Sequence, residues 1–302
     1  MDHISYFQAV VIGLLQGVTE LFPISSLGHS ILVPAWIGGS WTALVTDQSK
    51  AESPYLAFIV ALHVATALAL VALFWRDWVG IVRGFFTSLV HRRIETTHER
   101  LAWLIVVSTI PAGLLGLVLE HPLRTLFAKP LFAAVFLTLN GLVLFAAERL
   151  RRRAPRHRPA PDAVDAEGPV PGLDVAMTQQ VSVRDAGVIG LLQSGALLAG
   201  ISRSGITMAG GLLRGLTHEE AVRFAFLLAT PIILAAGVLK VPDLMGPLGE
   251  GIRAQSLAGA GAAFVAALAA ATFLQRWFKT RTLTPFAVYC LVAGVLSIVR
   301  FA

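Results

Sequence analysis

The sequence predicts an all-α integral membrane protein with six transmembrane helices and two re-entrant helix–loop–helix hairpins, arranged as an inverted-topology repeat. Three observations support this prediction: the apolar composition, the long stretches without charge, and the duplication of a short polar motif. Apolar residues make up 56% of the 302 residues and charged residues only 14%, with a mean hydropathy of +0.73. A soluble globular protein has about 25% charged residues. We therefore expect most of the chain to lie in a membrane.

Six stretches are long and apolar enough to cross a bilayer. About 20 residues, at a rise of about 1.5 Å each, span a hydrocarbon core of about 30 Å. The stretches are 55–75, 101–119, 130–147, 221–239, 254–275 and 282–299. Arg223, near one end of its stretch, is the only charged residue within them.

A short segment occurs twice. Residues 9–30 align without gaps to residues 186–207, with 11 identities in 22 positions, six of them in one unbroken run. Each copy precedes three of the six apolar stretches, so we divide the single membrane domain (1–302) into a first repeat over 9–149 and a second over 186–302. Because three spans change sides of the membrane, the second copy must start on the opposite face from the first.

Polar and Gly/Pro residues interrupt both copies. An unbroken spanning helix tolerates such a sequence poorly, whereas a hairpin that dips to mid-depth and returns accommodates it. Irregular backbone at that depth is allowed only where protein or a water-filled cavity surrounds it. We therefore expect two hairpins that point toward each other near the midplane.

The distribution of Lys and Arg predicts the orientation. If all six stretches cross, residues 76–100, 149–185 and 276–281 share one side and contain 15 Lys/Arg, against six on the other. The basic side of a membrane protein usually faces the cytoplasm. This places both termini and the mouth of the first hairpin outside.

Residues 150–183 are rich in Arg, then in Pro, Asp, Glu and Gly. Such a composition cannot bury a core, so we expect an unfolded cytoplasmic linker between the repeats. Its basic start directly follows an apolar stretch, where basic clusters set topology or contact anionic lipid. We expect no binding to nucleic acid.

The second polar segment predicts an anion pocket. Gly200, Ser202, Arg203, Ser204 and Thr207 bring together a close-approach glycine, three hydroxyl groups and a guanidinium, without an acidic neighbour. Glycine lets backbone approach a ligand closely, and the planar guanidinium suits phosphate oxygens. A helix that begins near this point would add its positive end.

The first polar segment contains groups suited to catalysis. Gln16 and Glu20 are four residues apart, so they share one face of a helix, and their oxygens suit Mg²⁺ or Ca²⁺. Alternatively, Glu20 orients or deprotonates a nucleophile. Ser25 and Ser26 offer hydroxyl groups beside the imidazole of His29, which is either the acid/base or itself the nucleophile.

Three ionisable residues in otherwise apolar segments, Glu20, His29 and Arg203, are functional candidates because a charge at mid-membrane costs about 2.5–3.5 kcal/mol. The alternative is a structural ion pair between the hairpins. For His63, in the first apolar stretch, we expect a structural role.

These motifs resemble the membrane undecaprenyl-diphosphate phosphatases, also called bacitracin-resistance phosphatases. The first family motif is Glu or Gln four residues before Glu, then Pro-x-Ser-Ser-x-Gly-His, which reads here as Gln16, Glu20 and Pro23–His29. The second, Pro-Gly-x-Ser-Arg-Ser-x-x-Thr, reads as Ala199–Thr207. The resemblance covers nearly the whole chain except the linker. Where the first motif allows Glu or Gln, this chain has the neutral residue, Gln16. In the second motif, Ala199 takes the place of the proline.

The resemblance implies hydrolysis of a long-chain polyprenyl (undecaprenyl) diphosphate to the monophosphate, which recycles the lipid carrier for cell-wall synthesis and confers bacitracin resistance. It also implies a divalent cation, a location in the bacterial plasma (inner) membrane and a site that opens to the periplasmic or extracellular side. The catalytic roles that it implies fall on Glu20, Ser26, His29 and Arg203, supported by Gln16, Ser25, Ser202, Ser204 and Thr207. The sequence leaves the oligomeric state open, a homodimer included.

Two other classes of membrane protein share some of these features. A secondary transporter also has inverted repeats and broken helices, but it needs no Ser/His/Glu set facing an anion pocket. A phosphatidic-acid-type lipid phosphatase has its own Gly-His and Ser-Arg motifs, but it also requires a His and an Asp after the Ser-Arg. The residues from Ser204 to Arg214 contain neither.

Overall fold

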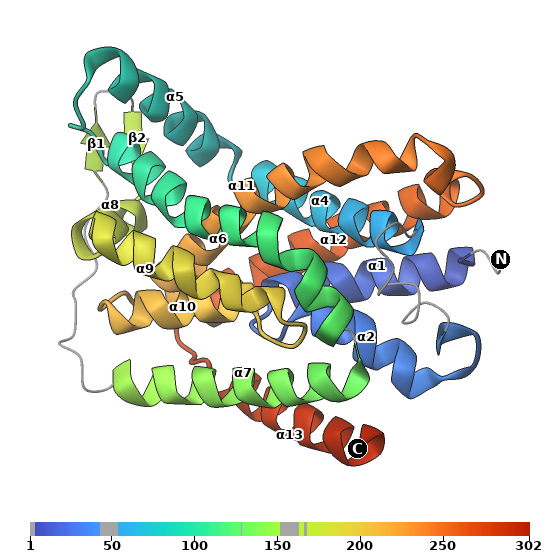
Figure 1. Ribbon diagram of the computed structural model, residues 1–302. Coiled ribbons are helices and arrows are strands. Elements are labelled where there is room, and N and C mark those ends of the chain that lie inside the picture. Colours follow the sequence, from blue (N-terminus) through green and yellow to red (C-terminus); the bar gives the residue numbers. More distant parts are fainter. Residues whose placement is uncertain (1–3, 43–53, 128, 152–162, 166–167) are drawn as a thin grey trace.

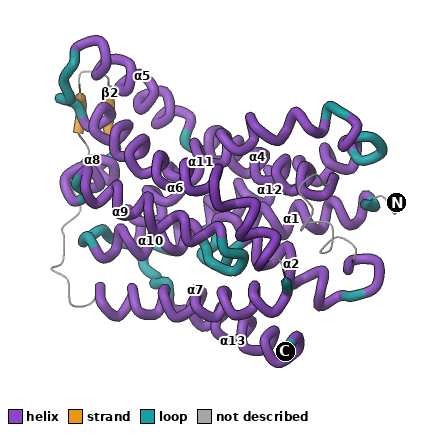
Figure 2. The backbone as a smooth tube through the Cα atoms, viewed as in Figure 1, coloured by secondary structure: helices purple, strands orange, loops and turns teal. Residues whose placement is uncertain are grey.

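A computed structural model describes residues 4–42, 54–127, 129–151, 163–165 and 168–302 of the chain (Figure 1). Figure 2 shows that this part is almost entirely helical. The α-helices of the first half are α1 (Tyr6–Leu21), α2 (Ser26–Ile37), α4 (Pro54–Leu73), α5 (Trp75–His91), α6 (Thr97–Phe127) and α7 (Pro130–Arg151). Those that follow are α8 (Gly172–Gln180), α9 (Val183–Gln193), α10 (Arg203–Leu213), α11 (His218–Lys240), α12 (Arg253–Trp277) and α13 (Thr284–Phe301).

Short elements complete the described part. The 3₁₀ helices are η1 (Gly39–Trp41), η2 (Ser194–Leu197), η3 (Val241–Leu244) and η4 (Pro247–Gly249). Two strands, β1 (Ala163–Asp165) and β2 (Gly168–Val170), pair antiparallel with Ala163 opposite Val170.

Six helices of the described residues, α4, α6, α7, α11, α12 and α13, are long and apolar enough to cross a membrane. They cover the six predicted stretches, so this prediction is confirmed. Large apolar side chains face outward along them, among them Leu117 at 71% and Val299 at 77% exposure. Such exposure is expected of a surface that contacts lipid chains.

The two polar segments form two pairs of shorter helices, α1 with α2 and α9 with α10, which are called the first and second hairpin below. With 16, 12, 11 and 11 residues, α1, α2, α9 and α10 are each shorter than the six spans. In Figure 1, α1 enters from the side of the N-terminus and α2 returns toward it, whereas α9 and α10 run the opposite way. The second helix of each pair begins with an equivalent cap: Ser25 Oγ accepts from the Gly28 N–H, and Ser202 Oγ accepts from the Gly205 N–H.

The packing of the helices is reciprocal between the two halves. Helix α1 lies along α12 and α9 lies along α6, while α4 pairs with α11 and α7 with α13. Equivalent glycines permit the first two contacts. A Cβ on Gly13 would lie 2.2 Å from the Gly259 oxygen, and one on Gly190 would lie 2.4 Å from the Ser108 oxygen. The duplicated residues thus make duplicated contacts.

The prediction of an unfolded linker over 150–183 is wrong for its second part. Strands β1 and β2 and helix α8 occupy much of it, and α8 contacts α6 and α11. Ala176 and Met177 are fully buried. The average composition of the segment gave the wrong prediction, because the few apolar residues that it contains are concentrated in α8. They are enough to pack this helix against the spans. Residues 152–162 and 166–167 lie outside the described part.

A buried ionic cluster attaches α8 to the spans. Arg223 of α11 donates from Nε and Nη2 to the two carboxylate oxygens of Asp174, at 2.6 and 2.9 Å. Its Nη2 also lies 3.0 Å from Asp77 Oδ1, and its guanidinium lies over the ring of Phe74. The charge in the fourth apolar stretch is therefore neutralised by groups from two other elements.

We expect Asp174→Asn to destabilise the protein by about 3 kcal/mol, because breaking a buried ion pair leaves a charge only partly compensated. Melting in detergent measures this effect. The control is Glu95→Gln, which breaks the exposed Arg93–Glu95 pair at 3.2 Å and should cost less than about 0.5 kcal/mol. Equal melting temperatures for the two variants would contradict a stabilising role of this ionic cluster.

Candidate active site

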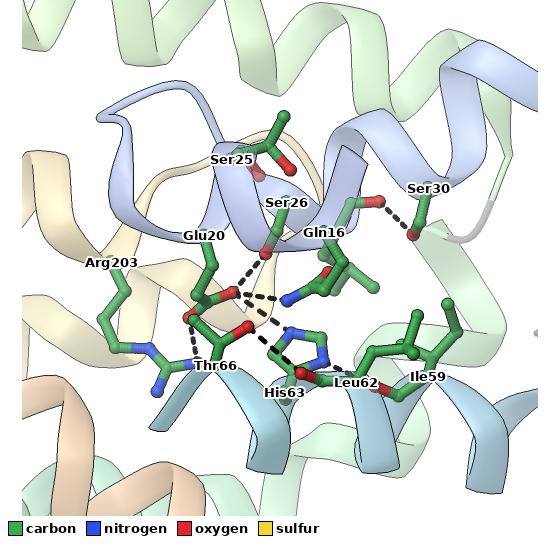
Figure 3. A network of polar contacts seen from close by, with 12 residues as sticks. Gln16, Glu20, Ser25, Ser26, Ser30, Ile59, Leu62, His63, Thr66 and Arg203 are labelled. Atoms are coloured by element: carbon green, nitrogen blue, oxygen red, sulfur yellow. Dashed lines mark hydrogen bonds and ion pairs between the residues drawn. The ribbon is translucent and has the colours of Figure 1, made fainter. Parts of the chain in front are cut away.

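The carboxylate of Glu20 lies at the centre of a polar cluster where the two hairpins meet (Figure 3). Glu20 belongs to the last turn of α1, and its side chain is 4% exposed. Ser26 Oγ donates to Glu20 Oε2 at 2.5 Å, and Gln16 Nε2 donates to the same oxygen at 3.1 Å. The expected shared face of Gln16 and Glu20 is confirmed.

Two cationic or basic groups face this carboxylate from other elements. Arg203 Nη2, from the first residue of α10, lies 3.6 Å from Glu20 Oε1. His63 Nε2, from α4, lies 3.2 Å from Glu20 Oε2. The hairpins of the two halves and the first span thus contribute to one site. His63, for which we expected a structural role, thus contacts the central carboxylate.

Ser25 joins the tips of the two hairpins, which are the turn between α1 and α2 and the turn before α10. Its Oγ accepts from the N–H groups of Gly28 and Gly200, at 3.2 and 3.1 Å. Ser25 itself has a φ of 70°, a conformation that costs about 1–3 kcal/mol outside glycine and persists where the surroundings enforce it. A Cβ on Gly28 would lie 2.9 Å from the Gly200 Cα. The close contact of the tips places Ser26 and Arg203 on either side of Glu20.

Hydrogen bonds from α7 and α10 reinforce this contact. Asn140 of α7 donates to the Pro23 carbonyl and accepts from the Ser202 N–H, both at 3.0 Å. Ser204 Oγ lies 3.4 Å from the Glu20 carbonyl and 3.0 Å from Ser202 Oγ. Ser202 and Ser204, predicted to bind phosphate, thus hold the second tip against the first.

His29 is turned toward a different neighbour. Its Nδ1 bonds to the Ser25 carbonyl at 2.7 Å and its Nε2 to the Tyr289 hydroxyl of α13 at 2.8 Å. The His29 and Tyr289 rings are also stacked. Since Nδ1 must donate to a carbonyl, Nε2 accepts from the tyrosine. Both ring nitrogens are therefore engaged away from Glu20, and the expected pairing of His29 with a serine hydroxyl is not seen.

Among the described residues, two buried polar atoms of the predicted site residues lack a hydrogen-bond partner: Gln16 Oε1 and Thr207 Oγ1. Thr207 lies four residues after Arg203 on α10, so their side chains share a face of that helix. An unsatisfied buried polar group costs about 1–3 kcal/mol. A cation would satisfy the Gln16 oxygen, and an anionic oxygen would accept from the Thr207 hydroxyl.

A hard divalent cation fits part of this donor set. Mg²⁺ is typically held by one or two carboxylates together with substrate phosphate and water. Glu20 and Gln16 Oε1 would supply two oxygen ligands. Within the described ranges no group of three or more His, Cys, Asp or Glu side chains could hold a metal by itself, so the remaining ligands would come from substrate and water.

Sequence reasoning missed His63 and Asn140. The rule that singled out Glu20, a polar or ionisable group in an apolar segment, also applies to both, since Asn140 is fully buried in the third apolar stretch. What the sequence lacks is their position relative to the hairpins.

Comparison with known proteins finds a matching family and several similar sequences. A family described as bacitracin resistance protein BacA matches residues 9–296. The undecaprenyl-diphosphatase of Mycolicibacterium paratuberculosis is 59% identical over 302 residues, which cover 99% of this chain and 98% of the relative. Undecaprenyl-diphosphatase 2 of Frankia alni is 54% identical over 341 residues, covering 100% and 99%. The undecaprenyl-diphosphatase of Gluconobacter oxydans is 41% identical over 295 residues, covering 96% of each.

Proposed function

The chain belongs to the bacitracin resistance protein BacA family, and from this premise we propose that it removes the terminal phosphate of undecaprenyl diphosphate at the Glu20 cluster. The products are inorganic phosphate and the lipid monophosphate that serves again as carrier in cell-wall synthesis. Removal of the diphosphate accounts for bacitracin resistance. The single observation that supports this site is the meeting of Glu20, Ser26 and Arg203 at the two hairpin tips.

In this proposal Arg203 binds the terminal phosphate. Its guanidinium is 25% exposed, more than any other charged group of the cluster. It also begins α10, and the N-terminus of a helix attracts anions. The unpartnered Thr207 hydroxyl lies one turn further along and donates to the same phosphate.

Ser26 is the nucleophile favoured by the geometry. Its hydroxyl already donates to Glu20 Oε2, so Glu20 takes the proton as Ser26 Oγ bonds to the terminal phosphorus. The bond to the bridging oxygen breaks, and the leaving lipid monophosphate takes that proton from Glu20. Glu20 then accepts a proton from water, whose oxygen attacks the phosphoserine, and returns it to Ser26 Oγ as inorganic phosphate leaves. His29 would first have to break its bonds to Ser25 and Tyr289.

A divalent cation, Mg²⁺ or Ca²⁺, forms part of the proposal. When bound near Gln16 and Glu20, it would neutralise charge that develops on the phosphate oxygens. The unpartnered Gln16 Oε1 supports this placement.

The protein is a multi-pass membrane protein, and we propose that it lies in the inner membrane with an inverted repeat. The opposite courses of the two hairpins and the reciprocal helix packing support the inverted arrangement (Figure 1). The Lys/Arg distribution supports a cytoplasmic α5 and α8, so the first hairpin opens to the outside.

We expect Ser26→Ala, Glu20→Gln and Arg203→Ala each to lower kcat/KM by about 10³-fold or more, because each removes a group that acts on the transferred phosphoryl group. The assay is release of inorganic phosphate from long-chain polyprenyl diphosphate by purified protein in detergent. Arg214→Gln is the control, since Arg214 pairs with Asp185 outside the cluster at 3.0 Å.

Full activity in Arg203→Ala or Glu20→Gln would refute the site. An active Ser26→Ala beside an inactive His29→Asn would refute the choice of nucleophile. Lipid transport in liposomes without any phosphate release by the natural protein would favour a carrier.

Chelation of divalent cations should abolish phosphate release, and Mg²⁺ or Ca²⁺ should restore it. We expect Gln16→Leu to raise the cation concentration for half-maximal activity by about 10-fold, because one of few oxygen ligands is lost. Gln16→Glu should lower it by adding a second carboxylate. Gln193→Leu, at the duplicated position in the other hairpin, is the matched control. Activity that is insensitive to chelation would contradict the cation site.

A further inference from the structure

A basic residue of the first span contacts the proposed catalytic carboxylate, and nothing in the reaction described above uses it. We propose that His63 is a positioning residue: it holds Glu20 toward Ser26 while Arg203 engages the phosphate. This inference rests on the proposed phosphatase reaction.

The His63 ring is fixed at both nitrogens. Its Nδ1 bonds to the Ile59 carbonyl of its own helix at 2.8 Å, and its Nε2 lies 3.2 Å from Glu20 Oε2. Both nitrogens thus contact oxygen atoms, and these two contacts fix the orientation of the ring. The ring is anchored to α4, so it provides a donor whose position does not depend on the substrate.

The two carboxylate oxygens of Glu20 have different partners (Figure 3). Within the described part of the chain, Oε1 faces the guanidinium of Arg203 at 3.6 Å. Oε2 accepts from Ser26 and Gln16 and faces His63. The oxygen that takes the proton of Ser26 is therefore the one that His63 holds.

This division matters when substrate arrives. Arg203 must turn at least part of its guanidinium from Glu20 to the phosphate, and its long, partly exposed side chain permits this. A buried carboxylate that loses a partner is destabilised unless other contacts hold it in place. His63 remains beside Glu20 Oε2, so Arg203 is free to bind substrate without displacing the base.

The competing explanation is that His63 only fills space in the span. Thr66, one turn further along α4, illustrates such a role: it is fully buried and its hydroxyl donates to the Leu62 carbonyl of the same helix at 3.0 Å. Thr66→Val therefore serves as the control for changes in α4.

The test compares three His63 variants in the phosphate-release assay. His63→Gln places an amide N–H near the position of Nε2, and we expect at least a third of the natural kcat. His63→Leu has no donor, and we expect kcat to fall about 100-fold with KM changed less than about threefold, as for a displaced catalytic group. His63→Asn is polar but too short to reach Glu20, and we expect it to be as slow as His63→Leu.

Each outcome decides between the explanations. The comparison of His63→Gln with His63→Asn does not depend on whether His63→Leu folds, since both variants place an amide at the same position of α4. Monodisperse elution and an unchanged melting temperature in detergent verify folding. Equal kcat values for the three His63 variants would overturn the positioning role. So would a loss of kcat in Thr66→Val as large as the loss in His63→Leu. An inactive natural protein would instead refute the proposed function itself.

Discussion

The buried carboxylate of Glu20 is the constraint on which the site depends. A charge at this depth in an apolar protein is costly unless partners compensate it, and here the partners come from three separate parts of the chain. Arg203 lies 3.6 Å and His63 3.2 Å away, while Ser26 and Gln16 donate to the same oxygen. Three of these partners lie in the first half of the chain and Arg203 lies in the second, so the site joins the two copies of the duplicated segment.

The contact between the hairpin tips follows from local backbone requirements. Ser25 adopts a positive φ and accepts from two glycine N–H groups, one in each hairpin. Asn140 then bonds to both tips from α7. The duplicated glycines that let α1 and α9 approach their partner helices bring both tips to this position. Small residues thus permit both the close packing of the helices and the contact between the tips, with the acid and hydroxyl in one copy and the guanidinium in the other.

Much of this arrangement was predictable from the sequence because it depends on local patterns. The length and apolarity of the six stretches predict the six spans. The polar residues that interrupt each copy of the duplicated segment predict its division into two shorter helices. The separation of Gln16 and Glu20 is a helical one. The rest depends on long-range contacts: the engagement of His29 by Tyr289, the approach of His63 to Glu20, and the docking of α8 through Asp174. No spacing in the sequence encodes which helices become neighbours, so these features had no local pattern.

The central claim is that Arg203 transfers from Glu20 to the substrate phosphate while Glu20 keeps its place beside Ser26. A cryo-electron microscopy structure of the protein with orthovanadate, a mimic of the transferred phosphoryl group, tests this directly. The account predicts vanadate bonded to Ser26 Oγ and contacted by Arg203, with Glu20 still facing His63. Vanadate bonded to His29, or an Arg203 that remains paired only with Glu20, would contradict it.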